Sequence, residues 1–445
     1  MSFNIGLSGL YAANKSLDVT GNNIANVATT GFKSSRIEFA DQYAQSIRGT
    51  SGGTSVGSGV TTAAVSQQFS QGSLTTGTGN SLDLAINGNG FFMLSNKGDS
   101  LYTRAGAFHT DKDGYVVNSS GMNLQGYNVD ANGTVMVGSS GDLRVDSSNQ
   151  LASPTSMITN TANLNSTSAI PTVTPFDATN SKTYNDTYST TVFDSQGNEH
   201  RMESYFAKNG TNSWTMYSLI DGRNISNPAS TVPDANNLTF DSSGSLIINT
   251  GTTPTSPSPS ANVAVNADGT FKVTNWVPAI QTGTGNSATW GPNGAAGVAS
   301  GIQLDMTAST QTASATGRSA QAQNGYAAGQ IKDMSVDASG KLFASYTNGQ
   351  SKVIGQVSLT SFANVQGLAP AGGTNWRETF SSGIPGTGAP QSGTLGYVTG
   401  QALEESNVDL TLELVNLIKA QSNYQANAKT ISTQSTIMQT TIQMT

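Results

Sequence analysis

The chain contains no cysteine and two histidines among 445 residues. Without cysteine, disulfide frameworks and zinc-finger spacings are impossible, and two histidines are too few for an all-histidine zinc site. Cysteine usage alone leaves both the cytosol and a bacterial exterior open as locations. No run of 18 apolar residues occurs, and the opening segment lacks the pattern of a cleaved signal peptide. We therefore expect neither membrane insertion nor signal cleavage.

Charge is also scarce. Only 11% of the residues are charged, with 20 basic against 27 acidic side chains and a net charge of -7. A typical soluble domain has roughly 25% charged residues, so this surface must draw its polarity from Ser, Thr, Asn, Gln and Gly. Thinly scattered basic residues provide no patch for a phosphate backbone, and we expect no nucleic-acid partner. The 49 glycines favour short strands joined by tight turns.

Three patterns resemble chemical sites, and each lacks an essential part. His200 and Asp194 could join a serine in a catalytic triad, because triad members meet in space and not in sequence. The calcium-loop-like start at Asp111 has Met122 where a bidentate glutamate belongs. The glycines of Gly88–Phe92 lack the helix and acidic residue of a dinucleotide site. We expect no enzyme activity, metal or cofactor. A catalytic triad and a carboxylate pair acting on polysaccharide stay open as alternatives, because both depend on distances in space.

Acidic residues gather near the start of the predicted C-terminal helix, where the helix dipole favours negative charge. A capping role is expected for these residues: Glu404, Glu405, Asp409 and Glu413.

Both ends of the chain have apolar residues at heptad spacing. Near the N-terminus these are Phe3, Leu10, Leu17 and Ile24, flanked by Leu7 and Val27, which predicts a helix over residues 2–28. Near the C-terminus they are Leu410, Leu417, Tyr424, Ile431 and Met438, joined by Leu414, Ala428 and Ile442. One narrow seam cannot hold two such helices, since isolated helices are marginal in water. We expect these ends to pair and to gain their order on assembly with other copies.

The middle of the chain has the character of a β-rich body. Six four-residue segments begin with Asp or Asn and end with Gly, a combination that closes hairpin turns: 111–114, 130–133, 194–197, 241–244, 266–269 and 337–340. Two Gly- and Ser-rich stretches, Gly49–Gly59 and Gly372–Gly400, have the composition of flexible joints.

We predict a mainly β fold with paired terminal α-helices and a nested multidomain arrangement. The expected parts are a helix and linker (1–71), an inner β-domain in two pieces (72–147 and 325–395), an inserted outer β-rich domain of one or two subdomains (148–324) and a C-terminal helix (396–445).

The two ends resemble the signatures of the bacterial flagellar rod and hook proteins. "SLDVTGNNIANVATTGFKSSRIEF" is similar to the N-terminal signature, and "LEESNVDLTLELVNLIKAQSNYQANAKTI" to the C-terminal one. Ser189–Gly222 resembles the outer β-domain that the hook subunit carries and that rod proteins generally lack. The resemblance thus implies a structural subunit that polymerises into a curved, flexible tube and transmits torque from rod to filament.

The family also implies partners: further copies of the chain, flagellar rod proteins, the hook cap, hook–filament junction proteins, and the flagellar type III export apparatus with its chaperones. It implies an extracellular location at the hook. A distal rod protein and, more remotely, a secreted β-rich adhesin are the alternatives. The expected assembly residues at the N-terminal end are Phe3, Leu7, Leu10, Leu17, Asn22, Asn23, Ile24, Asn26, Thr30, Gly31, Phe32 and Lys33. Those at the C-terminal end are Ser406, Asn407, Val408, Asp409, Leu410, Leu414, Leu417, Gln421, Tyr424, Asn427, Ile431, Met438 and Ile442.

Overall fold

The computed structural model describes residues 2–42, 57–130, 133–146, 148–247, 262–266, 268–283 and 288–444. Two compact units divide the chain. The terminal unit comprises Met1–Ser147, Lys332–Ser345 and Ser351–Thr445, and the inserted unit comprises Ser148–Ile331 and Tyr346–Gln350. The predicted joint at Gly49–Gly59 lies outside the described residues except for its last three.

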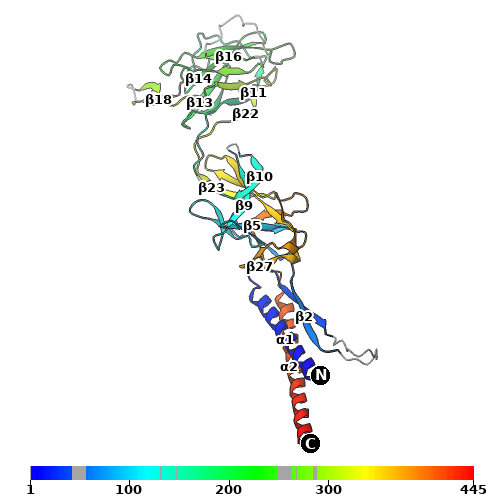
Figure 1. Cartoon of the computed structure of the whole chain (residues 1–445). Coiled ribbons are helices and arrows are strands. Elements are labelled where there is room, and N and C mark those ends of the chain that lie inside the picture. The colour runs from blue at the N-terminus through cyan, green and yellow to red at the C-terminus, as the bar shows by residue number, and fades with distance from the viewer. Residues whose placement is uncertain are drawn as a thin grey trace. The chain divides into compact units, whose positions relative to one another are not determined.

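The terminal unit begins and ends with a helix, as the heptads predicted. Helix α1 spans Ser2–Ala25 and helix α2 spans Leu410–Gln443. The two run antiparallel, since Gly6 faces Ile431 and Asn23 reaches Glu413. Figure 1 shows them side by side, with α2 continuing past the N-terminal end of α1. The predicted fold class, mainly β with paired terminal helices, is confirmed.

The β-sheets of the terminal unit hold most of its core. Its large sheet has the order β23-β24-β25-β9-β5-β6-β28-β27. The bounds along this path are Ile331–Val336, Lys341–Tyr346, Ser351–Val357, Asn123–Val129, Phe91–Asn96, Asp99–Thr103, Asn375–Arg377 and Ala369–Gly372. Strands β7 (Phe108–Thr110), β8 (Val116–Asn118), β10 (Val135–Asp142), β26 (Leu359–Ser361) and β29 (Gly386–Gly388) extend it.

Smaller ribbons connect the helices to this sheet. Strand β1 (Ser35–Asp41) pairs with β2 (Val60–Gln67), β3 (Leu74–Thr76) with β31 (Ala402–Glu404), and β4 (Leu84–Asn87) with β30 (Tyr397–Gly400). The last two ribbons each join a segment near the N-terminus to one near the C-terminus. The structure thus brings the two ends of the chain together at the base of the helix pair.

The inserted unit is built from two main sheets. One has the order β16-β17-β20-β11-β21, with β22 on β11, and the other has the order β12-β13-β14-β15. Their bounds are Val263–Val265, Phe271–Val273, Ile302–Asp305, Met157–Asn165, Thr310–Thr312 and Gly317–Gln323, then Asp186–Phe193, Glu199–Gly210, Ser213–Ile220 and Asp234–Thr239. A ribbon of β18 (Ala279–Thr282) and β19 (Thr289–Pro292) completes it. Side chains from both sheets form one apolar core, in which Trp214 Nε1 donates to Gln311 Oε1 at 2.9 Å.

The six predicted Asp/Asn-x-x-Gly turns are confirmed. In each turn the glycine has a positive φ and its N–H donates to the carbonyl of the first residue. The asparagine or aspartate thereby starts the turn and glycine supplies the left-handed backbone, as expected for these residue types.

The predicted flexible joint at Gly372–Gly400 is wrong. Three strands, β28, β29 and β30, and a 3-10 helix, η3 (Phe380–Ser382), lie within it. The strands pair with β6, β26 and β4, respectively. One of its glycines allows close approach, because a Cβ on Gly396 would lie 2.2 Å from the carbonyl oxygen of Asn87. Glycine content signals close packing here, and composition alone could not separate this use from flexibility.

Candidate assembly surface

The two helices touch through small residues. Gly6, Ala13 and Thr20 are buried at seven-residue spacing on α1. A Cβ on Gly9 would lie 2.4 Å from Asn427 Oδ1, and one on Gly6 would lie 3.1 Å from Ile431 Cγ1. The seam therefore follows the predicted heptad, but its contact positions are the small residues that lie three positions after the large ones.

The large apolar side chains of the helices lie beside this seam or point away from it. Ala420 is the one buried residue of α2 along its 34 residues. The side chain of Ile418 is 62% exposed and that of Ile442 is 74% exposed. The other exposed apolar residues of the pair are Phe3, Tyr11, Leu410, Leu412, Leu414, Val415, Tyr424, Ile437, Met438 and Met444. We call this set, with Ile418 and Ile442, the open helix face, meaning all sides of the helix pair that the seam does not occupy.

A buried ion cluster lies where the helices meet the β-strands. Glu404 Oε1 lies 2.5 Å from Lys33 Nζ, and Glu404 Oε2 lies 3.1 Å from Arg104 Nη1. Lys33 also donates to the carbonyl of Ser70, and Arg104 donates to the carbonyl of Gly88, each at 2.7 Å. Burial lowers the pKa of Lys33 and of Arg104, and the charge and hydrogen bond of Glu404 counter that shift in both. This cluster ties the segment after α1 to the segment before α2.

Two asparagines of the terminal signatures, Asn23 and Asn407, hydrogen-bond to the chain next to this ion cluster. Asn23 is buried; its side chain accepts from Ser35 N–H and donates to Ser35 O, both at 2.9 Å, and donates to Glu413 Oε1 at 3.3 Å. Asn407 Oδ1 accepts from Ser34 N–H at 2.7 Å, and its Nδ2 donates to Gln68 O at 2.7 Å. Both asparagines therefore serve the chain's own structure.

The loop after α1 is shaped by Gly31. Its φ is 69°, and a Cβ there would lie 2.4 Å from the backbone nitrogen of Ala105. Its N–H donates to the carbonyl of Glu404 at 2.8 Å. Only glycine combines a left-handed backbone with so close an approach. The loop is thus an intrachain joint as well as the end of a helix.

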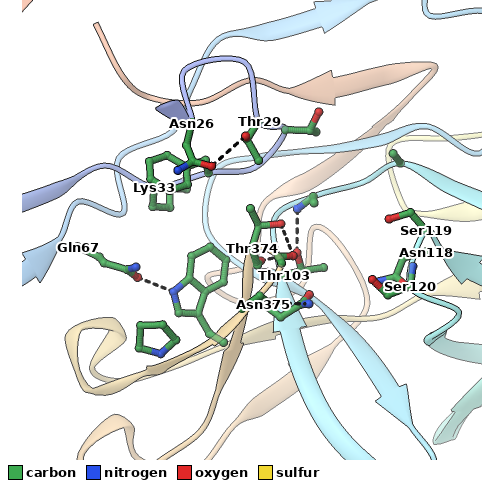
Figure 2. Close-up of a pocket in the computed structure, with 18 of the residues that line it drawn as sticks. Asn26, Thr29, Lys33, Gln67, Thr103, Asn118, Ser119, Ser120, Thr374 and Asn375 are labelled. Atoms are coloured by element: carbon green, nitrogen blue, oxygen red, sulfur yellow. Dashed lines mark hydrogen bonds between the residues drawn. The ribbon is translucent and has the colours of Figure 1, made fainter. Parts of the chain in front are cut away.

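A groove of about 630 Å³ opens between this loop and the β-strands. Figure 2 shows Asn26 and Thr29 of the loop facing Thr103, Thr374 and Asn375 across it. Its further lining residues include Asn22, Thr30, Phe32, Lys33, Gln67, Asn118, Ser119, Ser120 and Trp376. More than half of the lining residues are Ser, Thr, Asn or Gln, the residue types that supply the chain's polarity. Four of the predicted assembly residues with polar side chains, Asn22, Asn26, Thr30 and Lys33, line this groove.

The remaining predicted assembly residues occupy different environments. Phe3, Leu410, Leu414, Tyr424, Met438 and Ile442 lie on the open helix face, and Gln421 and Asp409 are also exposed. Half-buried positions are held by Leu7, Leu10, Leu17, Ile24, Phe32, Ser406, Val408, Leu417, Asn427 and Ile431. Their role in assembly stays a prediction.

The predicted capping role is right for two of the four acidic residues, Asp409 and Glu413, and wrong for the other two, Glu404 and Glu405. Asp409 caps α2, accepting from Thr411 N–H and Leu412 N–H, and Glu413 lies in its first turn. Glu405 accepts from the Thr75 hydroxyl. Glu404 is instead the anion of the buried cluster. Its partner Arg104 was missed, because the two are 300 residues apart and no local pattern connects them.

His200, the histidine considered for a catalytic triad, has a carboxylate partner at each of its two ring nitrogens. His200 Nδ1 lies 2.6 Å from Asp221 Oδ2, and its Nε2 lies 3.3 Å from Asp194 Oδ2. Burial opposes the charged imidazole, but the hydrogen bonds and charges of Asp221 and Asp194 outweigh burial and raise the pKa of His200. No ring nitrogen is left to accept a serine proton, so this arrangement does not suit a triad.

Among the described residues, no group of three or more His, Asp or Glu side chains could hold a metal ion. Neither of the two described helices has the length and apolarity needed to cross a membrane.

Comparison with known families matches four parts of the chain. These are described as flagella basal body rod protein (residues 3–33), flagellar hook protein FlgE/F/G D1 domain (85–161), flagellar basal body protein FlaE D2 domain (163–326) and flagellar basal body rod FlgEFG protein C-terminal (399–444).

Relatives match over the full length. The flagellar hook proteins FlgE of Escherichia coli and of Salmonella typhimurium are each 38% identical to the chain, and each comparison covers 100% of both sequences. A crystal structure of the Helicobacter pylori flagellar hook protein FlgE2 aligns with a TM-score of 0.46 and 13% identity, covering 73% of this chain and 98% of that one. From its full-length relatives, the chain belongs to the flagellar hook protein family.

Proposed function

We propose that this chain is the structural subunit of a bacterial flagellar hook, and that its copies polymerise through the open helix face into a curved, flexible tube. One observation carries the proposal. Helix α2 buries a single residue along its length, while most of its large apolar side chains remain exposed.

The energetic argument is direct. Burying a large apolar side chain fully yields about 1.5–3 kcal/mol. A monomer leaves that free energy unused along both helices, because small residues occupy their mutual seam. Copies arranged around a common axis would bury the open helix face, and identical contacts that do not close into a ring generate a helical tube. The monomer would stay soluble at low concentration because no single exposed residue supplies enough free energy for association.

We assign the flexibility of the tube to the polar outer surfaces of the subunits. A tube that rotates while bent must lengthen and shorten each row of subunits, so outer contacts have to exchange at low cost. Ser-, Thr- and Asn-rich surfaces with few charges suit this role, since water-mediated contacts exchange between arrangements of similar free energy. The inserted unit, held together by its own core, is suited to move as a rigid body.

Family membership supports the remaining roles. We assign the chain to the extracellular hook, reached through the flagellar type III apparatus without signal cleavage. Rod proteins, the hook cap, hook–filament junction proteins and export chaperones are its proposed partners. The distal rod alternative is disfavoured, because rod proteins generally lack an insertion and this chain has a second compact unit.

Electron microscopy of the purified chain under polymerising conditions tests the proposal. Curved tubes with a central channel are expected for the wild type. Ile418→Asp combined with Ile442→Asp should give folded monomers, because it places charges on the open helix face. Val232→Asp, at an exposed apolar site of the inserted unit, is the matched control and should still form tubes. Tubes of normal yield from the double variant would reject the helix face as the assembly contact.

A further inference from the structure

Two large apolar side chains of the terminal unit stand in solvent far from the helices in sequence. Phe380 is fully exposed and Ile384 is 91% exposed. They follow each other closely in the segment "TFSSGIPG", which we call the 380–384 knob. Exposure of this degree for two neighbouring large apolar residues marks an interaction site when the backbone that carries them is fixed.

The backbone under the knob is fixed by its own hydrogen bonds. Thr379 caps η3 with a reciprocal pair of bonds to Ser382, whose side chain is buried. The hydroxyl of Thr379 also donates to Gly367 O at 2.6 Å, and Asn364 Nδ2 donates to Ser381 O at 3.0 Å. The neighbouring helix η2 (Val365–Gly367) packs so closely that a Cβ on Gly367 would lie 2.4 Å from the Ser381 carbonyl carbon. The knob therefore cannot fold its side chains inward by a simple loop movement.

Charge lies on only one side of the knob in sequence, where Arg377 and Glu378 precede it. No charged residue occurs from Thr379 to Leu403. The cores of protein interfaces are depleted of charged residues and enriched in aromatic ones, and the knob itself, with Phe380 and no charge, fits that composition. A phenylalanine held rigidly in solvent gives the monomer no favourable burial, so its favourable burial would have to come from a partner.

We propose that the 380–384 knob is a contact between subunits, inserted into the surface of a second copy of this chain in the polymer. The inference rests on the proposed function, because it takes the neighbour to be another hook subunit. Two observations favour a second copy over another partner. The knob belongs to the same compact unit as the open helix face, so every copy in a tube carries it in the same position relative to its neighbours. It is also a different patch from the helix face, and a knob that fits elsewhere on an identical copy makes the head-to-tail contact that a helical polymer requires.

The absence of cysteine makes the contact measurable. A Phe380→Cys variant carries a single thiol, so maleimide labelling reports on that position alone. We expect labelling in sedimented polymers to be at least about tenfold slower than in monomers. Val137→Cys, at another exposed apolar site of the terminal unit, controls for general crowding and should label at similar rates in both states. Equal labelling rates of the Phe380→Cys variant in monomers and polymers would show that the knob is not a contact between subunits.

Assembly itself provides the second measurement. Phe380→Ser with Ile384→Ser should raise the critical concentration for polymerisation by about tenfold or more, without changing monomer unfolding. Phe380→Leu with Ile384→Val should restore it. An unchanged critical concentration for the serine variant would refute the contact. Wild-type tubes with a freely reactive position 380 would reject the knob alone, whereas a wild type that never polymerises would reject both the knob and the proposed function. Protection that needs an added second protein would also reject the second copy as the partner.

Discussion

Lys33 and Glu404 are 371 residues apart in the chain, and their side chains meet in a fully buried ion pair of 2.5 Å. Arg104 completes the cluster from a strand end of the β-domain. Because one anion serves two buried cations, the pair fastens both terminal segments to the same point. This is the base from which the helices project, so its integrity sets how the open helix face is presented.

Glu404→Gln should destabilise the terminal unit strongly. Removing one partner from a buried ion pair costs about 3–5 kcal/mol, since Lys33 and Arg104 would be left without a counter-charge. Urea unfolding of the monomer measures the loss. Glu405→Gln is the matched control, because Glu405 is exposed, and it should change the free energy of unfolding by no more than about 0.5 kcal/mol. Equal effects for the two variants would contradict a structural role for the cluster.

The asparagines after the first helix should separate into two classes. Asn23→Ala leaves the N–H and carbonyl of Ser35 without their side-chain partners and should cost about 1–3 kcal/mol of unfolding free energy. Asn26 is only half-buried, and Asn26→Ala should lower polymerisation while the monomer remains close to wild type in stability. Chemical unfolding and a sedimentation assay for polymer, run on the same samples, test both. Normal polymerisation of the Asn26 variant would remove the groove from the assembly contacts.

The small-residue seam predicts a contrast between two glycines of the same helix. Gly9→Leu should disturb the seam, because even a Cβ there would lie 2.4 Å from Asn427 Oδ1, and the larger leucine would have to displace the Asn427 side chain. A Cβ on Gly21 would meet nothing within 4 Å, so Gly21→Leu should be tolerated, with a gain of helix propensity of up to about 1 kcal/mol. Circular dichroism and the yield of tubes report the outcome. Should Gly9→Leu assemble as well as Gly21→Leu, the seam would not hold the pair.

The inserted unit should lose stability at both ends of the pH range. His200 has a raised pKa when folded, so its contribution is complete below its ordinary pKa of about 6.5 and disappears as the pH rises through the folded value. For Asp194, burial opposes ionisation, but hydrogen bonds from Asn198, Asn293 and His200 lower its pKa to about 2. Its contribution is complete above about 3.9 and disappears as the pH falls toward 2.

Thermal unfolding followed by tryptophan fluorescence between pH 3 and pH 9 measures this dependence, since the Trp276 ring lies 5.3 Å from His200. His200→Gln should flatten the alkaline side of the profile. His109→Gln, which changes the other, exposed histidine, should leave it unchanged. A profile that keeps its alkaline slope in the His200 variant would assign the slope to another group.

Several elements could be predicted from the sequence because their signals are local. A heptad period predicts a helix, since residues i and i+7 lie on one side of the same helix. An aspartate followed three residues later by glycine predicts a turn, since side chain and backbone of four consecutive residues decide its geometry. The two helices and the six turns were predicted in this way.

Other features depend on partners that no local pattern connects. Whether Gly372–Gly400 was a joint or a packed segment depended on what approached its glycines, and Asn87 and Ser361 come from distant strands. The seam between the helices fell on Gly6 and Ala13, because close approach of two backbones excludes large side chains, and the leucines of α1 lie half-buried beside it.

The sequence by itself therefore determined the terminal helices, the turns of the β-rich body and the resemblance to the hook family, all of which rest on periodicity or on contiguous motifs. Only the tertiary structure decided that Glu404 neutralises Lys33 and Arg104, that Asn23 braces Ser35 and that Phe380 is held in solvent. Such pairings arise when segments that are far apart in the chain are packed together. That packing, and not the neighbouring residues in the chain, sets the free energy of burying a charge or exposing an aromatic ring.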